Sequence, residues 1–163
     1  MNKVSKIALA SSLVFGTTIG VNALASQNVQ NEAHAAQTPY YNYTGYTSAS
    51  SNFILDKNFK NAIKYDNLKI NGYKISKGDS NTSKMVDKYD QSFRVVGENK
   101  ADSVTFDLDG KSVSKEALFN AYGQAKASPT DSPAGLNYIY NIGGKKVQFY
   151  LNDGYVTKVQ INS

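Results

Sequence analysis

Residues 136–161 read LNYIYNIGGKKVQFYLNDGYVTKVQI and decide the fold class of this chain of 163 residues. Apolar and polar side chains alternate through three runs of the stretch, which is the period of a β-strand. The Gly-Gly pair at 143–144 fits a two-residue hairpin turn. Asn-Asp-Gly at 152–154 fits a three-residue loop whose glycine takes the left-handed conformation. The stretch therefore predicts a three-stranded antiparallel meander.

The two turns determine which side chains share a face of this meander. We expect a core face with three rows, in which Tyr140 aligns with Val147 and Val159, Tyr138 with Phe149 and Thr157, and Leu136 with Leu151 and Tyr155. The opposite face is expected to carry Asn137, Ile139, Asn141, Lys146, Gln148, Tyr150, Val156, Lys158 and Gln160. Such a face can bind a flexible polyanion, with lysines on phosphates and a tyrosine on a base. It equally suits an ordinary solvated sheet face.

A second hairpin is predicted at residues 67–76, NLKINGYKIS, because Asn-Gly between two alternating runs is a strong hairpin signal. With Asn71 and Gly72 as the turn, Lys69 lies directly opposite Lys74. Like charges that face each other across two strands cost stability. A bound anion would relieve this repulsion, and so would two long exposed side chains that splay apart.

The stretch 56–67, DKNFKNAIKYDN, predicts a short helix with Asp56 as its N-cap. Its apolar residues recur at helical spacing on one face, and its lysines recur on another. These two sets are Phe59, Ala62 and Ile63, and Lys57, Lys60 and Lys64. The helix is expected to pack its apolar face and to present its lysines to solvent.

Two further helices are predicted downstream. Residues 82–93, TSKMVDKYDQSF, favour a helix that turns Met85, Val86 and Tyr89 toward the core. Residues 114–123, SKEALFNAYG, favour a helix that follows a serine cap and ends at a glycine.

One more strand is predicted at residues 102–110, DSVTFDLDG, where apolar and polar residues alternate. Together these elements predict an α+β fold, in which short helices pack on one side of a twisted antiparallel sheet that ends in the meander. We expect a single domain over residues 56–163.

The first 35 residues predict a secretory signal peptide that is cleaved. Lys3 and Lys6 precede the apolar stretch IALASSLVFGTTIGV, and Ala33 and Ala35 form an A-x-A cleavage site. Cleavage after Ala35 would give a secreted protein that is released, or is held at the cell surface only by charge. An uncleaved membrane anchor is the alternative. After this site no apolar run is long enough to span a bilayer, so no membrane insertion is expected.

Residues 36–55 are expected to form a tyrosine-rich N-terminal arm or an edge strand. This segment is uncharged, and four tyrosines fall between residues 40 and 46. Two of them, Tyr41 and Tyr43, are candidates for stacking on unpaired bases. Otherwise these rings would close the edge of the sheet.

Composition excludes most catalytic chemistry. The chain has no cysteine, and its one histidine, His34, lies in the predicted signal peptide. The mature chain would therefore lack the residues for Cys–His or Ser–His–Asp catalysis. It would also lack the residues for a zinc site built on His or Cys. Asp107 and Asp109 precede a glycine, but the spacing of an EF-hand calcium loop is absent. Carboxylate-only chemistry and a Ser–Lys pair stay open, but neither has a recognisable local motif. We therefore expect no enzyme, no catalytic residue, no metal and no cofactor.

Charge points to an anionic partner. The formal net charge is +5, and residues 56–88 hold eight lysines and four aspartates. A basic stretch of this kind suits nucleic acid, an anionic polysaccharide or a membrane surface. A simpler interpretation of the same composition is that the lysines only keep the protein soluble.

Three strings resemble the immunodominant staphylococcal antigen B family: TPYYNYTGY at 38–46, NFILDKNFKNAIKYDN at 52–67 and KYDQSF at 88–93. After residue 93 the similarity is looser and rests on the pattern of a helix followed by a meander. The resemblance implies a secreted antigen associated with virulence, which binds extracellular nucleic acid with little sequence preference. It implies no catalytic residues.

Two hypotheses for function follow. The first is a non-enzymatic protein that binds extracellular DNA, RNA or another polyanion. Its binding residues would be Lys57, Lys60, Lys64, Lys69 and Lys74, with Lys146, Lys158 and Tyr150 as a second patch and Tyr41 and Tyr43 as stacking groups. The second is a protein-interaction module, a host-directed ligand or inhibitor, which uses the exposed sheet face and the tyrosines. The sequence assigns no oligomeric state.

Overall fold

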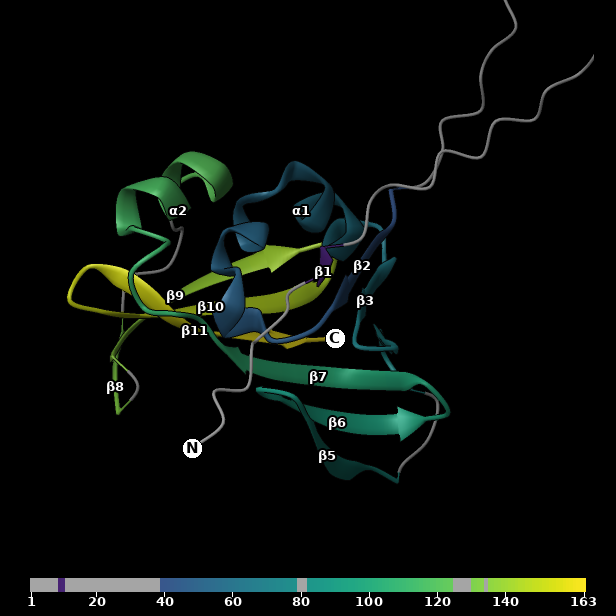
Figure 1. The fold of residues 1–163 in the computed structure, drawn as a ribbon. Helices are drawn as coiled ribbons and strands as arrows, with labels where there is room; N and C mark the ends of the chain where they lie inside the picture. Colours follow the sequence, from purple (N-terminus) through teal and green to yellow (C-terminus); the bar gives the residue numbers. More distant parts are fainter. Residues whose placement is uncertain (1–8, 11–38, 79–81, 125–129, 134) are drawn as a thin grey trace, which may run out of the picture.

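The computed structural model describes residues 9–10, 39–78, 82–124, 130–133 and 135–163 (Figure 1). These residues form one mixed sheet of eleven strands, with two α-helices and two 3-10 helices. The strands are β1 (Leu9–Ala10), β2 (Tyr41–Thr44), β3 (Leu68–Ile70), β4 (Tyr73–Ile75), β5 (Lys84–Lys88), β6 (Gln91–Gly97), β7 (Lys100–Asp107), β8 (Thr130–Ser132), β9 (Gly135–Ile142), β10 (Lys145–Asn152) and β11 (Tyr155–Asn162). The helices are η1 (Thr47–Ala49), η2 (Ser51–Leu55), α1 (Lys57–Lys64) and α2 (Lys115–Tyr122).

Strand β7 is the junction of the sheet. One of its edges pairs with β6, which in turn pairs with β5. Its other edge pairs with β4 at residues 100–101 and with β11 at residues 103–107. From β4 the strand order continues through β3 and β2 to β1. From β11 it continues through β10 and β9 to β8.

The fold is broadly α+β but consists mostly of strands, and its sheet is mixed and not purely antiparallel. Strands β2 and β3 are parallel, and so are β4 and β7. Parallel neighbours need a connection that returns along the sheet. Between β2 and β3 that connection consists of η1, η2 and α1, the segment that covers the core.

The prediction of a helix over residues 82–93 is wrong. This segment forms β5 and the start of β6, joined by a tight turn. Burial follows a period of two, because Gln91, Phe93 and Val95 are buried. The helical spacing would have buried Met85 and Tyr89, whose exposed fractions are 66% and 50%.

The hairpin at residues 67–76 is confirmed, with Lys69 opposite Lys74. Asn71 and Gly72 form its turn with positive φ angles of 47° and 92°. The two other predicted helices also form. The side chain of Asp56 accepts a hydrogen bond from the N–H of Asn58 at the start of α1. Ser114 caps α2 in the same manner.

The meander is confirmed, but one of its two registers differs from the prediction. Strands β9 and β10 pair as expected, with Tyr140 opposite Val147. Between β10 and β11, however, Val147 pairs with Ile161 and not with Val159.

Two local features cause this shift. The second turn has two residues, Asp153 and Gly154, both with positive φ angles, between a paired Asn152 and Tyr155. A bulge then interrupts the pairing beyond Leu151. As a result Val156, expected on the solvated face, is fully buried. Leu136, expected in the core, is exposed although it pairs with Leu151 as predicted.

The tyrosine-rich segment contributes β2, which lies between β1 and β3 near one end of the sheet. Of the predicted signal peptide, only Leu9–Ala10 lie among the described residues, and they form β1 beside β2. The predicted cleavage site lies outside them. None of the helices in the described ranges has the length and apolar character of a membrane span.

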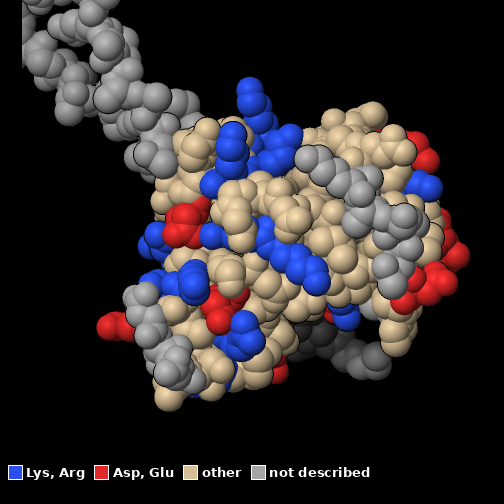
Figure 2. Space-filling view, turned by 180° about the vertical axis from the view of Figure 1, so that it is seen from behind, with Lys and Arg blue, Asp and Glu red and all other residues tan. Residues whose placement is uncertain are grey.

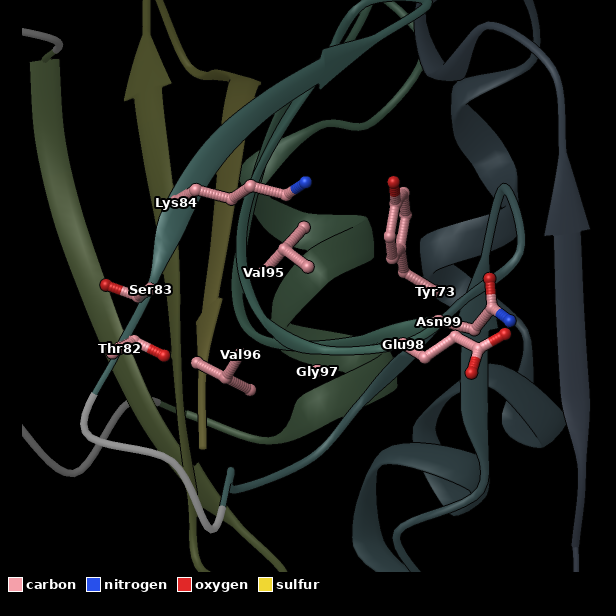
Figure 3. Close-up of a pocket in the computed structure, with 9 residues that line it drawn as sticks. All are labelled: Tyr73, Thr82, Ser83, Lys84, Val95, Val96, Gly97, Glu98 and Asn99. Carbon is pink, nitrogen blue, oxygen red and sulfur yellow. The ribbon is translucent and has the colours of Figure 1, made fainter.

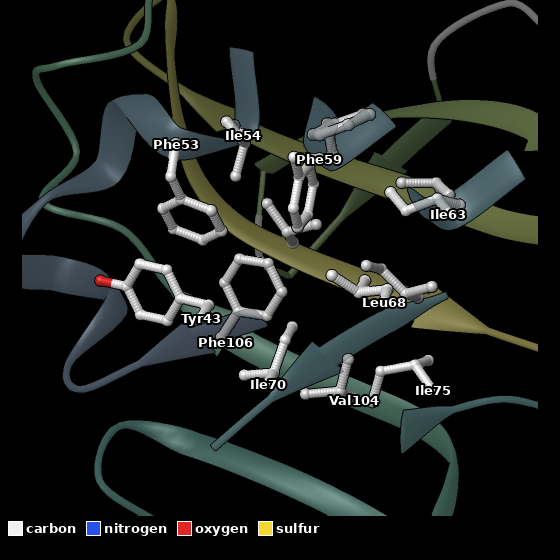
Figure 4. Packing of buried hydrophobic residues seen from close by; sticks show 14 of the residues in the cluster. Tyr43, Phe53, Ile54, Phe59, Ile63, Leu68, Ile70, Ile75, Val104 and Phe106 are labelled. Atoms are coloured by element: carbon white, nitrogen blue, oxygen red, sulfur yellow. The ribbon is translucent and has the colours of Figure 1, made fainter. Parts of the chain in front are cut away.

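The core lies between the sheet and the segment from η1 to α1. In Figure 4 the rings of Tyr43, Phe53 and Phe106 lie side by side, and the centroids of the first two are 4.2 Å apart. Phe59 of α1 meets Phe53 edge to face. Because Tyr43 lies in β2 and Phe106 in β7, these contacts join the tyrosine strand to the centre of the sheet.

Replacing Gly143 by alanine should destabilise the fold by about 2 kcal/mol, since a residue held in an incompatible backbone conformation costs roughly 1–3 kcal/mol. Gly143 has a φ of 57° in the β9–β10 turn, and a Cβ there would collide with the backbone of Lys64 at the end of α1. Urea denaturation would measure the loss. Gly144→Ala, which has open space around it, should cost less.

Candidate functional site

Backbone pairing brings three lysines into one row across neighbouring strands. Lys69 of β3 pairs with Lys74 of β4, and Lys74 pairs with Lys100 of β7. Adjacent strands lie roughly 4.8 Å apart, and residues in register point to the same face. The alternate residues of these strands, among them Ile70 and Ala101, are buried in the core. These three lysines, called the lysine row below, therefore stand together on the outer face of the sheet.

Lys69 and Lys74 were predicted as binding residues, and Lys100 was missed. Its position follows from the parallel pairing of β4 with β7, which joins two separate hairpins. No local pattern in the sequence marks such a pairing. The lysine-rich stretch at residues 56–88 contains Lys69 and Lys74 of the row but ends before Lys100.

The acidic side chain of Asp66 offsets part of the charge of the row. The ammonium of Lys74 lies 3.6 Å from a carboxylate oxygen of Asp66, which lies two residues past the end of α1. Asp66 also pairs with Lys145. The repulsion between Lys69 and Lys74 is thus partly relieved within the protein, which weakens the argument that this pair alone demands an anion.

A small pocket opens on the same outer face at the β2 end of the row. Its lining residues are Tyr40, Asn42, Thr44, Lys69, Asn71, Gly72, Lys88 and Tyr89, and its volume is about 340 Å³. Tyr40 and Tyr89 are each 50% exposed. The ammonium of Lys88 donates a hydrogen bond of 2.8 Å to the carbonyl of Asn71. Because Lys69 belongs both to the row and to this tyrosine pocket, the two form one continuous site.

The three lysines of α1 do not join the row. The helix packs Phe59, Ala62 and Ile63 on the core side of the sheet, whereas the row lies on the outer side. Lys57 and Lys64 are exposed on this separate surface. Lys60 donates to the carbonyl of Ala121 and lies 5.6 Å from the ring centroid of Tyr122, so it fastens α1 to α2.

Tyr43 is fully buried, which corrects the prediction that its ring stacks on a base. Its hydroxyl donates a 2.7 Å hydrogen bond to the carbonyl of Tyr46. Tyr41 is partly buried and meets Phe59 edge to face at 5.5 Å. Burial, with a smaller contribution from neighbouring negative charge, raises the pKa of each phenol to about 12. These two rings close the edge of the sheet, the alternative that the sequence left open.

The second predicted patch, on the meander, is largely satisfied by its own contacts. The hydroxyl of Tyr150 accepts a 2.8 Å hydrogen bond from Gln148 and donates one of 3.2 Å to Gln160. Lys158 lies 3.5 Å from a carboxylate oxygen of Asp107. Lys146 is exposed beside two asparagines of the flanking strands. This surface has the character of a solvated sheet face.

The surface charge is uneven. Figure 2 shows lysine and arginine side chains spread over the left and upper parts of the face seen from behind, with some acidic side chains among them on the left and several more gathered at the right edge. A face of one prevailing sign attracts a polyanion from a distance and orients it.

A larger pocket of about 640 Å³ lies between β4 and the β5–β6 hairpin (Figure 3). Tyr73 points into it from one side, and Lys84 and Val95 lie on the other. Its one lysine is balanced by Glu98, so it does not concentrate positive charge. Within the described ranges, no group of three acidic, histidine or cysteine side chains could hold a metal ion.

Comparison with known proteins assigns a family. The sequence model of immunodominant staphylococcal antigen B matches residues 40–161. Proteins of that name from Staphylococcus aureus strains USA300 and COL are 43% identical over 148 residues, which cover 86% of this chain and 83% of theirs. They are named as an antigen and not as an enzyme.

Among solved structures, a DUF4309 family protein (YjgB) from Bacillus subtilis is similar with a TM-score of 0.38 and 14% identity, over 57% of this chain and 72% of that one. This likeness is too weak to assign a fold or a function.

Proposed function

Because the chain belongs to the immunodominant staphylococcal antigen B family, we propose that it is a secreted, non-enzymatic antigen that binds extracellular nucleic acid without sequence specificity. The observation that carries the proposal is the lysine row, in which Lys69, Lys74 and Lys100 occupy three neighbouring strands of one face. A role in virulence or in contact with the immune system is part of the same proposal.

The arrangement of the row suits contact with phosphates. Lysine ammonium groups bind phosphate oxygens, and phosphates carry no sequence information. A rigid sheet keeps the three charges at a fixed spacing, so a flexible strand can follow them while the protein stays unchanged. Binding of this kind is electrostatic and independent of base sequence.

The alternative, a protein-interaction module anchored on the meander, receives less support. Its expected anchor, Tyr150, is partly buried and its hydroxyl is engaged by two glutamines of the same face. A side chain that already has its partners gains less from a new contact than a free one.

Fluorescence anisotropy with labelled single-stranded and double-stranded oligonucleotides, across a salt series, tests the proposal. If three lysines each neutralise one phosphate, a plot of the logarithm of the single-strand binding constant against the logarithm of the salt concentration should have a slope of about −2. Changing Lys69, Lys74 and Lys100 together to glutamate should abolish this binding. Failure of the full chain to bind either oligonucleotide at low salt would contradict the proposal.

A matched control separates the row from net charge. Lys57, Lys64 and Lys146 are exposed and lie off the row, so changing them to glutamate alters the net charge equally. The control variant should retain most of the affinity. Equal losses in both variants would mean that charge in general, and not the row, binds nucleic acid.

A further inference from the structure

Tyr89 stands in a backbone conformation that is unusual for its type. It is the first residue of the β5–β6 turn and has a φ of 58°. Left-handed conformations favour glycine and asparagine, and a bulky residue there is an outlier. Such outliers concentrate at functional sites, where the surrounding structure holds them. The ring of Tyr89 is nevertheless half exposed.

The surroundings hold this turn in place. The next residue, Asp90, accepts hydrogen bonds from the backbone N–H groups of Thr47 and Ser48, each at 2.9 Å. The ring of Tyr89 meets the ring of Tyr46 edge to face at 5.0 Å. One aromatic surface is therefore presented at a fixed position beside the lysine row, with little freedom left to lose on binding.

The pocket beside this ring has the size and lining for one flat anionic ligand unit. Tyr40 supplies a second half-exposed ring, and Lys69 and Lys88 supply positive charge. The volume of about 340 Å³ is at the small end of the range of roughly 300–1,000 Å³ for ligand sites. A nucleic acid duplex cannot enter such a space, whereas a single nucleotide can.

From these observations we infer that the tyrosine pocket binds one unpaired nucleobase, and that it gives the protein a preference for single-stranded over double-stranded nucleic acid. The inference rests on the proposed function, because the row supplies the phosphate contacts. Each base has a π-face, so stacking on Tyr40 or Tyr89 is tolerant of sequence. In a duplex these faces are covered by neighbouring base pairs, and the pocket stays empty.

The test compares two labelled oligomers of equal length, one of thymidine nucleotides and one of abasic nucleotides with the same phosphates. The full chain should bind the thymidine oligomer roughly 5- to 100-fold more tightly, the range expected for base–aromatic stacking. In the double variant Tyr40→Ser and Tyr89→Asn, that ratio should fall to about one.

Two controls keep the result interpretable. Asparagine adopts left-handed conformations readily, which offsets the loss of the ring contact with Tyr46, so Tyr89→Asn should unfold at nearly the same temperature as the parent. Tyr155→Ser removes an exposed tyrosine at the start of β11 and should leave the ratio intact.

The outcomes distinguish this inference from the proposed function. Equal affinity of the parent for both oligomers would overturn the base pocket while leaving the lysine row in place. A ratio that survives the double variant would also overturn it. No binding of either oligomer would overturn the proposed function and the inference together.

Discussion

Replacing Asp66 by alanine is expected to lower the free energy of unfolding by about 3 kcal/mol, the lower end of the loss seen when a buried charge loses its partner. The ammonium of Lys145 donates to the Asp66 carboxylate, and Lys145 is only 5% exposed. Without Asp66, the lysine at the start of β10 would remain in the interior without its counter-charge. Asp66 itself is half exposed, which places the loss at the lower end of that range.

Urea denaturation of the full chain would measure this loss. In the double variant with Lys145→Met, much of the stability should return, because the buried charge is gone as well. Asp107→Ala is the matched control, since its partner Lys158 is exposed and such surface ion pairs contribute under about 1 kcal/mol. Equal losses for Asp66→Ala and Asp107→Ala would show that the position of Lys145 is not what matters.

Replacing Asp90 by alanine is expected to cost about 3 kcal/mol, because several donors lose a charged acceptor worth roughly 1.5–3 kcal/mol per hydrogen bond. The carboxylate receives the N–H and the hydroxyl of both Thr47 and Ser48. These bonds tie η1, and with it the end of the tyrosine strand, to the β5–β6 turn. The loss should therefore also loosen the tyrosine pocket.

The same carboxylate predicts a dependence of stability on pH. Burial raises the pKa of Asp90, but the hydrogen bonds from Ser48 and Thr47 outweigh it, so the pKa is lowered overall. A group whose pKa is lower in the folded state contributes fully above the unfolded value, which is near 4 for Asp. Its contribution is lost as the pH falls from about 4 through the folded pKa.

Thermal unfolding of the parent and of Asp90→Asn at a series of pH values checks this. The parent should lose stability below about pH 4 more steeply than the variant, which has no carboxylate at this position to titrate. Parallel curves for the two proteins would mean that Asp90 does not supply the acid-sensitive stability.

If both proposals hold, the two parts of the site have different tasks. The lysine row would supply affinity for any nucleic acid through phosphates, and the tyrosine pocket would add a preference for unpaired bases. The stacking groups expected from the sequence, Tyr41 and Tyr43, point into the core, whereas Tyr40 and Tyr89 are exposed on the outer face.

The sequence by itself determined the elements whose signals are local. The Asn-Gly turn produced the 67–76 hairpin, and Asp56 marked the start of α1. Alternation over residues 136–161 predicted the meander, because a strand shows its period within a few residues. The lack of cysteine, and of histidine outside the predicted signal peptide, was the basis for expecting neither Cys–His nor Ser–His–Asp catalysis.

Only the tertiary structure decided the features that depend on distant partners. Residues 82–93 have a composition that suits a helix, but Phe93 packs on Tyr73 and Asp90 binds η1, so the segment forms strands. Lys100 joined the row through a parallel pairing between two hairpins. Burial and hydrogen bonds between segments far apart in the chain determine these features. Patterns within a few neighbouring residues therefore do not predict them.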